Sequence, residues 1–124
     1  MAVKVVDASA LASVLFGESA GGSIASRLEA SLVMAPTLLR YEIASVCRKK
    51  IGRHPERRGA LLEALSLFLD LEIGEVEIPP LEVTSLAEES GLTVYDASYL
   101  WLSRQLDANL ITLDARLEAA ASGR

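Results

Sequence analysis

The chain has 124 residues, which suits one domain with its own core and is too short for two domains of ordinary size. Hydrophobic residues make up 51% and charged residues 23%, a balance that excludes a disordered chain. No apolar run approaches the length of a membrane span, no signal peptide opens the sequence, and the single cysteine, Cys47, excludes an internal disulfide. We therefore expect one cytoplasmic domain over residues 1–124.

The net charge of -5 argues against a simple nucleic-acid-binding protein, because phosphate binding usually draws on clustered Lys and Arg. Net charge hides local clustering, and bound divalent cations would change the sign of an acidic site. One dense basic stretch is present, made of Arg48, Lys49, Lys50, Arg53, Arg57 and Arg58. It suits either contact with an RNA backbone or solvated helix ends.

The apolar pattern predicts strands and helices that alternate along the chain. The first half gives, in order, a strand at 3–6, a helix at 8–16, a turn at 18–22, a helix through Ile24 and Leu28 to Leu32, a strand at 32–35, and a long helix that opens at Pro36 and ends near Gly52. The second half gives a helix at 55–71, a strand through Val76 and Ile78 that Pro79 ends, a short helix that closes at Gly91, a helix at 94–106, a strand at 110–113 and a last helix from Ala115. Strands separated by helices imply an α/β fold with a mostly parallel sheet covered on both faces.

Two aspartates directly follow predicted strands. Asp7 comes after the first strand and Asp114 after the last. Because ligands in such sheets bind beyond the carboxyl ends of the strands, both side chains are expected at the ligand-binding edge. Each aspartate is equally suited to cap the helix that it precedes, so neither one assigns a site by itself.

Glu42 lies within an apolar stripe of its predicted helix. Its neighbours three and four residues away are Leu38, Leu39 and Val46. An ionised carboxylate is unstable in such a stripe without a partner, and Arg40, two residues away, points elsewhere on the helix. A buried ion pair, a place at the edge of the stripe, or a bound metal ion would each explain Glu42.

Asp96 lies three residues after Thr93 at a predicted helix start, an arrangement that resembles a capping box and is sufficient to explain the residue. The four acids nevertheless have a common interpretation, since three lie at strand ends or helix starts and the fourth on an apolar helix face. Gathered carboxylates raise one another's pKa, whereas one or two Mg²⁺ or Mn²⁺ ions would keep them charged. Such ions activate water for attack on phosphorus, so the pattern predicts a metal-dependent phosphodiester hydrolase.

Four segments, each with one of these acids, resemble the motif blocks of a known family. They are VVDASAL at 5–11, APTLLRYEIA at 35–44, GLTVYDA at 91–97 and LITLDARL at 110–117. In order and separation these segments are similar to the blocks of PIN-domain ribonucleases, in particular the VapC toxins of prokaryotic toxin–antitoxin pairs. The resemblance covers nearly the whole chain.

The resemblance implies a PIN-like three-layer α/β/α sandwich and an endoribonuclease with Mg²⁺ or Mn²⁺ as cofactor. It places the catalytic and metal-binding acids at Asp7, Glu42, Asp96 and Asp114. It also gives secondary roles in the site to Ser9 and Thr112. Without any site role, Ser9 would be an ordinary hydroxyl at a helix start and Thr112 an ordinary strand threonine, and these explanations suit the two residues equally well. The implied partners are an RNA substrate, a cognate antitoxin that occludes the groove, and a second copy in a homodimer. Relatives usually continue beyond Leu117 into another short edge strand, which this sequence does not predict.

Other classes of protein fit the sequence less well. A receiver-like Mg²⁺-binding signalling domain would need an acidic pair near the first strand and a lysine after the last strand. This sequence has neither. A catalytically silent PIN-fold binding module finds no support, because no acid position is replaced. Arg48 and His54 have a spacing that resembles the motif of HEPN ribonucleases, which are all-helical, whereas this chain has predicted strands. His54 is the only histidine, so a histidine pair for acid–base catalysis is excluded within one chain.

Overall fold

The computed structural model describes residues 1–123 and leaves Arg124, the last residue of the expected domain, outside the description. Its strands are β1 (Ala2–Val6), β2 (Ser31–Pro36), β3 (Ile73–Val76) and β4 (Asn109–Ile111). Its α-helices are α1 (Ala8–Leu15), α2 (Gly21–Leu28), α3 (Leu39–Arg53), α4 (Arg58–Phe68), α5 (Pro80–Ser90), α6 (Val94–Gln105) and α7 (Ala115–Ser122), with a short 3₁₀ turn over Pro55–Arg57. No helix within residues 1–123 is long and apolar enough to cross a membrane.

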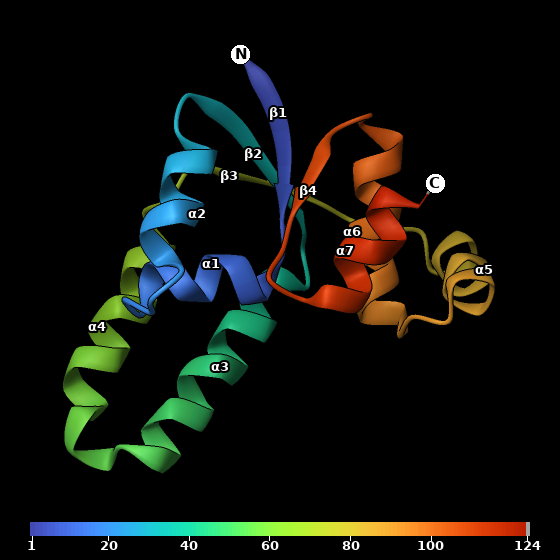
Figure 1. The fold of residues 1–124 in the computed structure, drawn as a ribbon. Helices are drawn as coiled ribbons and strands as arrows, with labels where there is room; N and C mark the ends of the chain where they lie inside the picture. The colour runs from blue at the N-terminus through green and yellow to red at the C-terminus, as the bar shows by residue number, and fades with distance from the viewer. Residues whose placement is uncertain (124) are drawn as a thin grey trace.

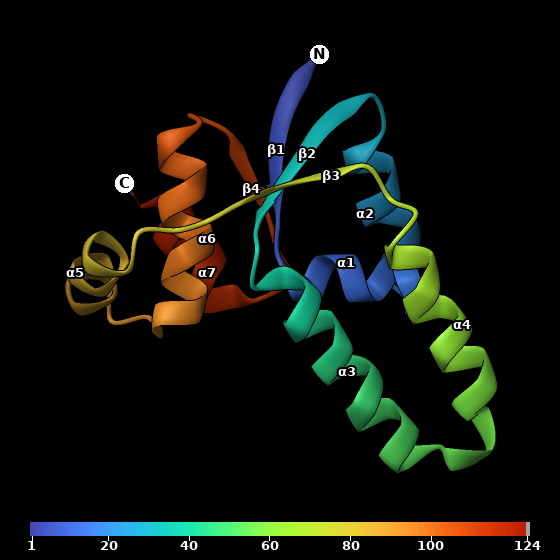
Figure 2. The same cartoon turned by 180° about the vertical axis from the view of Figure 1, so that it is seen from behind.

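The strands form one parallel sheet in the order β3-β2-β1-β4. Helices α1 to α4 lie on one side of the sheet and α5 to α7 on the other, which confirms the three-layer α/β/α sandwich (Figures 1 and 2). Because the strands are parallel, their carboxyl ends meet at one edge. The first turns of α1, α3, α6 and α7 gather at this edge, while α3 and α4 extend away from the sheet as a helical hairpin.

The core forms where the helices close over the central strand. Val5 and Val6 at the end of β1 are fully buried, as expected for a parallel strand covered on both faces. On neighbouring elements Ile111, Leu39 and Leu100 are equally inaccessible. The carboxyl ends of the central strands therefore lie over a fully buried part of the core.

Two helix boundaries of the long α3 differ from the sequence prediction. Pro36 was expected in the first helical turn but is the last residue of β2, where it lies opposite Val76 in the sheet register. Proline has no N–H to give to a ladder, and the sheet closes instead with a bond from the Thr37 N–H to the Val76 carbonyl at 3.1 Å. Gly52 does not end the helix, which continues to Arg53 and stops before Pro55, because a residue that precedes proline avoids the helical region.

The bounds of β2 and β3 also differ from the sequence prediction, because hydrogen bonding between the two strands overrides the local pattern of apolar residues. Leu32 was assigned to the helical stripe of α2, but that helix ends at Leu28 and Leu32 lies in β2. The third strand was expected through Val76 and Ile78, but β3 ends at Val76, since its partner β2 ends opposite that residue. The helix predicted over 55–71 is divided into the 3₁₀ turn and the shorter α4.

The contact between α1 and α2 provides a stability test at two adjacent glycines. Gly21 is buried, and a Cβ added there would overlap the backbone carbonyl of Ser13 in α1, whereas a Cβ at Gly22 would meet nothing within 4 Å. We predict that Gly21→Ala lowers the free energy of unfolding by about 1–3 kcal/mol through this overlap. Gly22→Ala is the matched control and should leave stability unchanged or slightly raised. Urea denaturation of both variants measures the difference, and equal effects would contradict the described packing.

Candidate functional site

Asp7 is the most deeply buried of the four acids, with 4% of its surface exposed. Its backbone N–H donates to the carbonyl of Ile111 at 3.1 Å, which holds it beside the end of β4. Oδ1 accepts the Ala10 N–H at 3.0 Å and the Ser9 hydroxyl at 2.8 Å, and Oδ2 accepts the Thr112 hydroxyl at 2.6 Å. Asp7 thus caps α1, as one of the two sequence interpretations held, and is also fixed by a residue from the other end of the chain.

Ser9 and Thr112 join Asp7 to the segment that leads into α7. Ser9 Oγ accepts the N–H of Leu113 at 3.0 Å, and Thr112 Oγ1 accepts the N–H of Asp114 at 3.0 Å. Their two oxygens lie 3.4 Å apart. The structure therefore brings both predicted hydroxyl residues to the first acid, although β4 ends one residue before Thr112.

Asp114 is the helix cap of α7, where its Oδ1 accepts the N–H of Leu117 at 3.0 Å. It is half-buried, one residue beyond the segment that Ser9 holds. Its negative charge raises the pKa of Asp7 and, more prominently, that of Asp96. The capping interpretation of Asp114 is thus confirmed, and its charge still acts on the neighbouring acids.

Glu42 is held by a residue that the sequence analysis had assigned no role. The Tyr99 hydroxyl, on α6, donates to Glu42 Oε1 at 2.5 Å. Tyr99 is 1% exposed, and burial together with the nearby carboxylates raises its pKa far above the usual value, so it remains a proton donor. Burial also raises the pKa of Glu42, the Tyr99 bond opposes this shift, and the charges of Asp96 and Asp7 add to it. Glu42 forms no ion pair within residues 1–123 and is half-buried, so the ion-pair interpretation is wrong, while a place at the edge of the stripe and a metal ion both still suit it.

Asp96 lies in the first turn of α6 and makes only half of the predicted capping box. The Thr93 hydroxyl accepts the Asp96 N–H at 3.1 Å, but the described residues include no return bond from the Thr93 N–H to the carboxylate. Burial raises the pKa of Asp96 and the charge of Asp114 adds to this shift, while Arg116 and a hydrogen bond with the Thr93 side chain lower it. Of the three aspartates, Asp96 is therefore the one whose carboxylate caps no helix.

Tyr99 and Arg116 are the two residues at this edge that sequence reasoning missed. Tyr99 is three residues after Asp96 and so lies on the same face of α6, which was the available signal. Arg116 is two residues after Asp114, and its Nη2 donates to the carbonyl of Gly91 at 2.8 Å. This bond fixes the one guanidinium whose charge acts on Asp96.

The four acids at this edge, Asp7, Glu42, Asp96 and Asp114, are here called the acid cluster. The charge of Arg116 acts on Asp96, but no member of the cluster forms an ion pair within the described residues. The ion pairs within residues 1–123 are Arg40–Glu75, Lys50–Glu18 and His54–Glu56, and none includes a member of the cluster. The cluster and its two hydroxyls offer only oxygen donors, which suit hard cations such as Mg²⁺ or Mn²⁺.

The four acids do not form a ready-made metal cage. Within residues 1–123, no group of three or more His, Cys, Asp or Glu side chains is arranged so that it could hold a metal ion. Mg²⁺ usually keeps several waters and takes only one or two carboxylates from the protein, so an open set of donors fits this ion better than a closed one. The donor chemistry therefore fits a divalent cation held partly by water.

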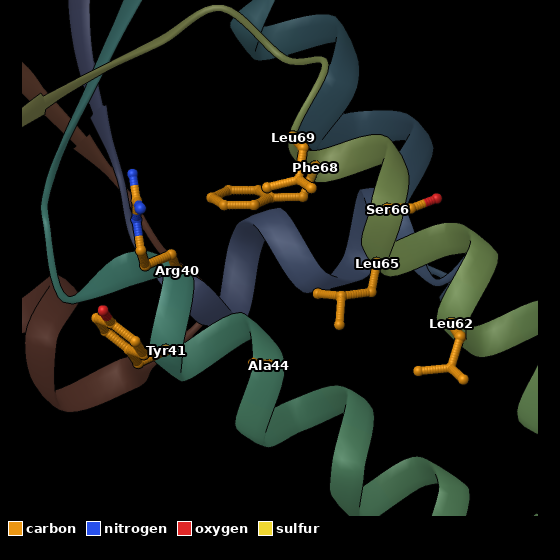
Figure 3. Close-up of a pocket in the computed structure, with 8 residues that line it drawn as sticks. All are labelled: Arg40, Tyr41, Ala44, Leu62, Leu65, Ser66, Phe68 and Leu69. Carbon is orange, nitrogen blue, oxygen red and sulfur yellow. The ribbon is translucent and has the colours of Figure 1, made fainter.

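An apolar cavity between α3 and α4 is separate from the acid cluster (Figure 3). It has a volume of about 350 Å³ and is lined by Arg40, Tyr41, Ala44, Leu62, Leu65, Ser66, Phe68 and Leu69. None of the four acids borders it. The four acids therefore lie outside this cavity.

The buried charge of Asp7 predicts a pH-dependent stability. Desolvation raises the pKa of Asp7 above the usual 3.8 despite hydrogen bonds from the Thr112 hydroxyl, the Ala10 N–H and the Ser9 hydroxyl, so the folded state binds this proton more tightly than the unfolded state. Ionised Asp7 then destabilises the fold, and the loss grows as the pH rises from about 3.8 through the folded-state pKa. In EDTA, the free energy of unfolding of the wild type should fall relative to that of Asp7→Asn as the pH rises from about 4 to about 7.

Urea titrations at several pH values measure this difference. Asp70→Asn, at an exposed position, controls for the removal of one carboxylate. A constant difference, or one that shifts in favour of wild type as the pH rises, would contradict a raised pKa at Asp7.

The fold and the acid cluster can now be compared with known proteins. The family model of the PIN domain matches residues 4–123, so this chain belongs to the PIN-domain family. Within that family it is 30% identical over 118 residues to Ribonuclease VapC3 of Pyrobaculum aerophilum, which covers 91% of this chain and 90% of that protein. It is 32% identical over 120 residues to Ribonuclease VapC1 of Mycobacterium tuberculosis, with 94% and 89% covered.

A solved structure agrees with this assignment. The crystal structure of PAE2754 from Pyrobaculum aerophilum matches with a TM-score of 0.78 and 32% identity, over 99% of this chain and 90% of that one. The resemblance drawn from the four motif blocks is therefore confirmed.

Proposed function

We propose that this chain is a metal-dependent endoribonuclease whose acid cluster holds one or two Mg²⁺ or Mn²⁺ ions. The observation that carries the proposal is the gathering of four carboxylates at one sheet edge, none of which forms an ion pair within residues 1–123. Such an arrangement weakens the fold unless a cation is bound, which is typical of a functional site. The relatives named ribonuclease support RNA as the substrate.

Each acid would contribute differently because its partners differ. Three hydrogen-bond donors hold Asp7 in one orientation, and Tyr99 does the same for Glu42, so these two are prearranged ligands. The carboxylate of Asp96 caps no helix, so it is suited to orient a water molecule and accept its proton, and its raised pKa favours that role. When bound, a divalent cation would activate that water and stabilise charge on the phosphate. Arg116 lies near enough to Asp96 for its charge to act on that acid, so it would add a positive charge beside the bound phosphate.

We further propose that the enzyme is the toxin of a type II toxin–antitoxin pair. The similarity to VapC proteins over nearly the whole chain supports this. A cognate antitoxin would then occlude the acid cluster, and the toxin would act in the cytoplasm, most simply as a homodimer. A small adjacent gene for a DNA-binding antitoxin would support this role.

RNA cleavage by the purified protein tests the nuclease proposal. We predict cleavage with Mg²⁺ or Mn²⁺ and none with EDTA. Asp7→Ala and Asp96→Ala should each lose more activity than the roughly 10- to 100-fold typical of residues that only hydrogen-bond the metal ligands. Asp70→Ala, an exposed aspartate, is the control and should retain full activity.

Cleavage that survives both chelation and substitution would contradict the metal mechanism. No cleavage of any RNA by the wild type with Mn²⁺ would instead favour the catalytically silent binding module.

A further inference from the structure

The positive charge of this protein is concentrated at the tip of the α3–α4 hairpin. Six of its twelve basic residues but only one of its seventeen acidic residues, Glu56, lie within 48–58. That segment therefore has a net charge of +5, and the remainder of the chain has -10. The hairpin carries this charge away from the body of the protein (Figures 1 and 2).

Most of these cations have no carboxylate partner although the chain is rich in acids. Lys50 pairs with Glu18, but the other five make no ion pair within the described residues 1–123. These five, here called the basic tip, are Arg48, Lys49, Arg53, Arg57 and Arg58, and all are exposed. Mutual repulsion disfavours such a cluster unless a polyanion binds it.

Both helices contribute to the basic tip. Arg48 on α3 and Arg58 on α4 line one cavity of about 460 Å³ between the two helices. The floor of this cavity includes Cys47, Ile51 and Leu62. Two guanidinium groups that face one concave surface are the usual arrangement for a phosphate, because each offers several N–H donors.

Helix α3 also connects the basic tip to the acid cluster. Glu42 lies in its first turn and Arg53 is its last residue, so the two are about 16 Å apart along the axis at 1.5 Å per residue. An RNA strand of about five stacked nucleotides spans this distance at 3.4 Å each. One strand held at the acids could thus reach the basic tip along α3.

We propose that the basic tip binds the phosphate backbone of the RNA substrate at a distance from the cleaved bond. This inference rests on the proposed nuclease function and assigns the tip to substrate binding, not to chemistry. At the turn between the two helices an acidic protein is the less favoured occupant, because residues 52–60 are all exposed and the only apolar residues among them are Pro55 and Ala60. The apolar lining of the cavity lies outside this turn. A stable protein contact would be expected to bury an apolar centre.

The test compares two double variants that change net charge equally. Arg53→Gln with Arg57→Gln removes two charges from the tip, and Arg27→Gln with Arg104→Gln removes two exposed charges from α2 and α6. Binding of a fluorescent 20-nucleotide RNA is measured in EDTA, where cleavage is absent, over a range of salt concentrations. Cleavage of the same RNA and of a 4-nucleotide RNA is measured separately with Mn²⁺.

We expect the tip variant to bind the long RNA about tenfold more weakly, with a salt slope smaller by about 1.5 to 2, and the control variant to bind like wild type. For cleavage, the KM for the long RNA should rise with kcat unchanged, and the short RNA should show no difference. Arg53→Lys with Arg57→Lys should retain binding, which separates lost charge from lost fold.

Equal binding by the tip and control variants would overturn the proposal, even if RNA is cleaved. Displacement of the RNA by polyglutamate at equal charge would also overturn it and would favour an acidic protein as the occupant. If no RNA is cleaved but the tip variant still loses RNA binding, the proposed nuclease function fails while the basic tip stands as an RNA-binding surface.

Discussion

The hydrogen bonds of the Asp7 carboxylate hold together the sheet edge at which the four acids lie. The carboxylate accepts a hydrogen bond from the hydroxyl of Thr112, which is 105 residues away, and it caps α1 at the same time. The edge strand β4 is thereby tied to the central strand β1, and the start of α7, with Asp114, is set beside the first acid. Together with the bond from the Leu113 N–H to Ser9 Oγ, this contact fixes the side chains of the two motif segments relative to each other.

Fixing Asp7 in this way leaves its charge unbalanced. Hydroxyls and a backbone N–H orient the carboxylate, but they do not offset the loss of hydration, and the pKa of Asp7 stays above its usual value. Glu42 and Asp96 are in the same state and act on their neighbours. The fold thus holds a negatively charged edge next to a positively charged hairpin, and both features suit a polyanion whose reacting phosphate is reached through a divalent cation.

The sequence predicted the α/β architecture and the positions of the acids because both follow from local rules. Parallel strands place their carboxyl ends together, so Asp7 and Asp114 could be assigned to one edge from their places after strands. Pro36 and Leu32 were assigned incorrectly, since their environment is set by strand pairing and not by neighbours in sequence. The Tyr99 contact to Glu42 joins α6 to α3 across 57 residues of sequence. The spacing of Tyr99 from Asp96 indicates that it shares a helix face with that acid, but it does not indicate the contact with Glu42.

Anomalous diffraction from crystals soaked in Mn²⁺ would show whether the acid cluster is a divalent cation site. If it is, an anomalous peak should lie within direct coordination distance of a carboxylate oxygen of Asp7 and of at least one of Glu42, Asp96 and Asp114. The peak should be absent from Asp7→Ala crystals soaked in the same way. Mn²⁺ bound only at other carboxylates, or no peak at the acid cluster in wild-type crystals, would contradict the account.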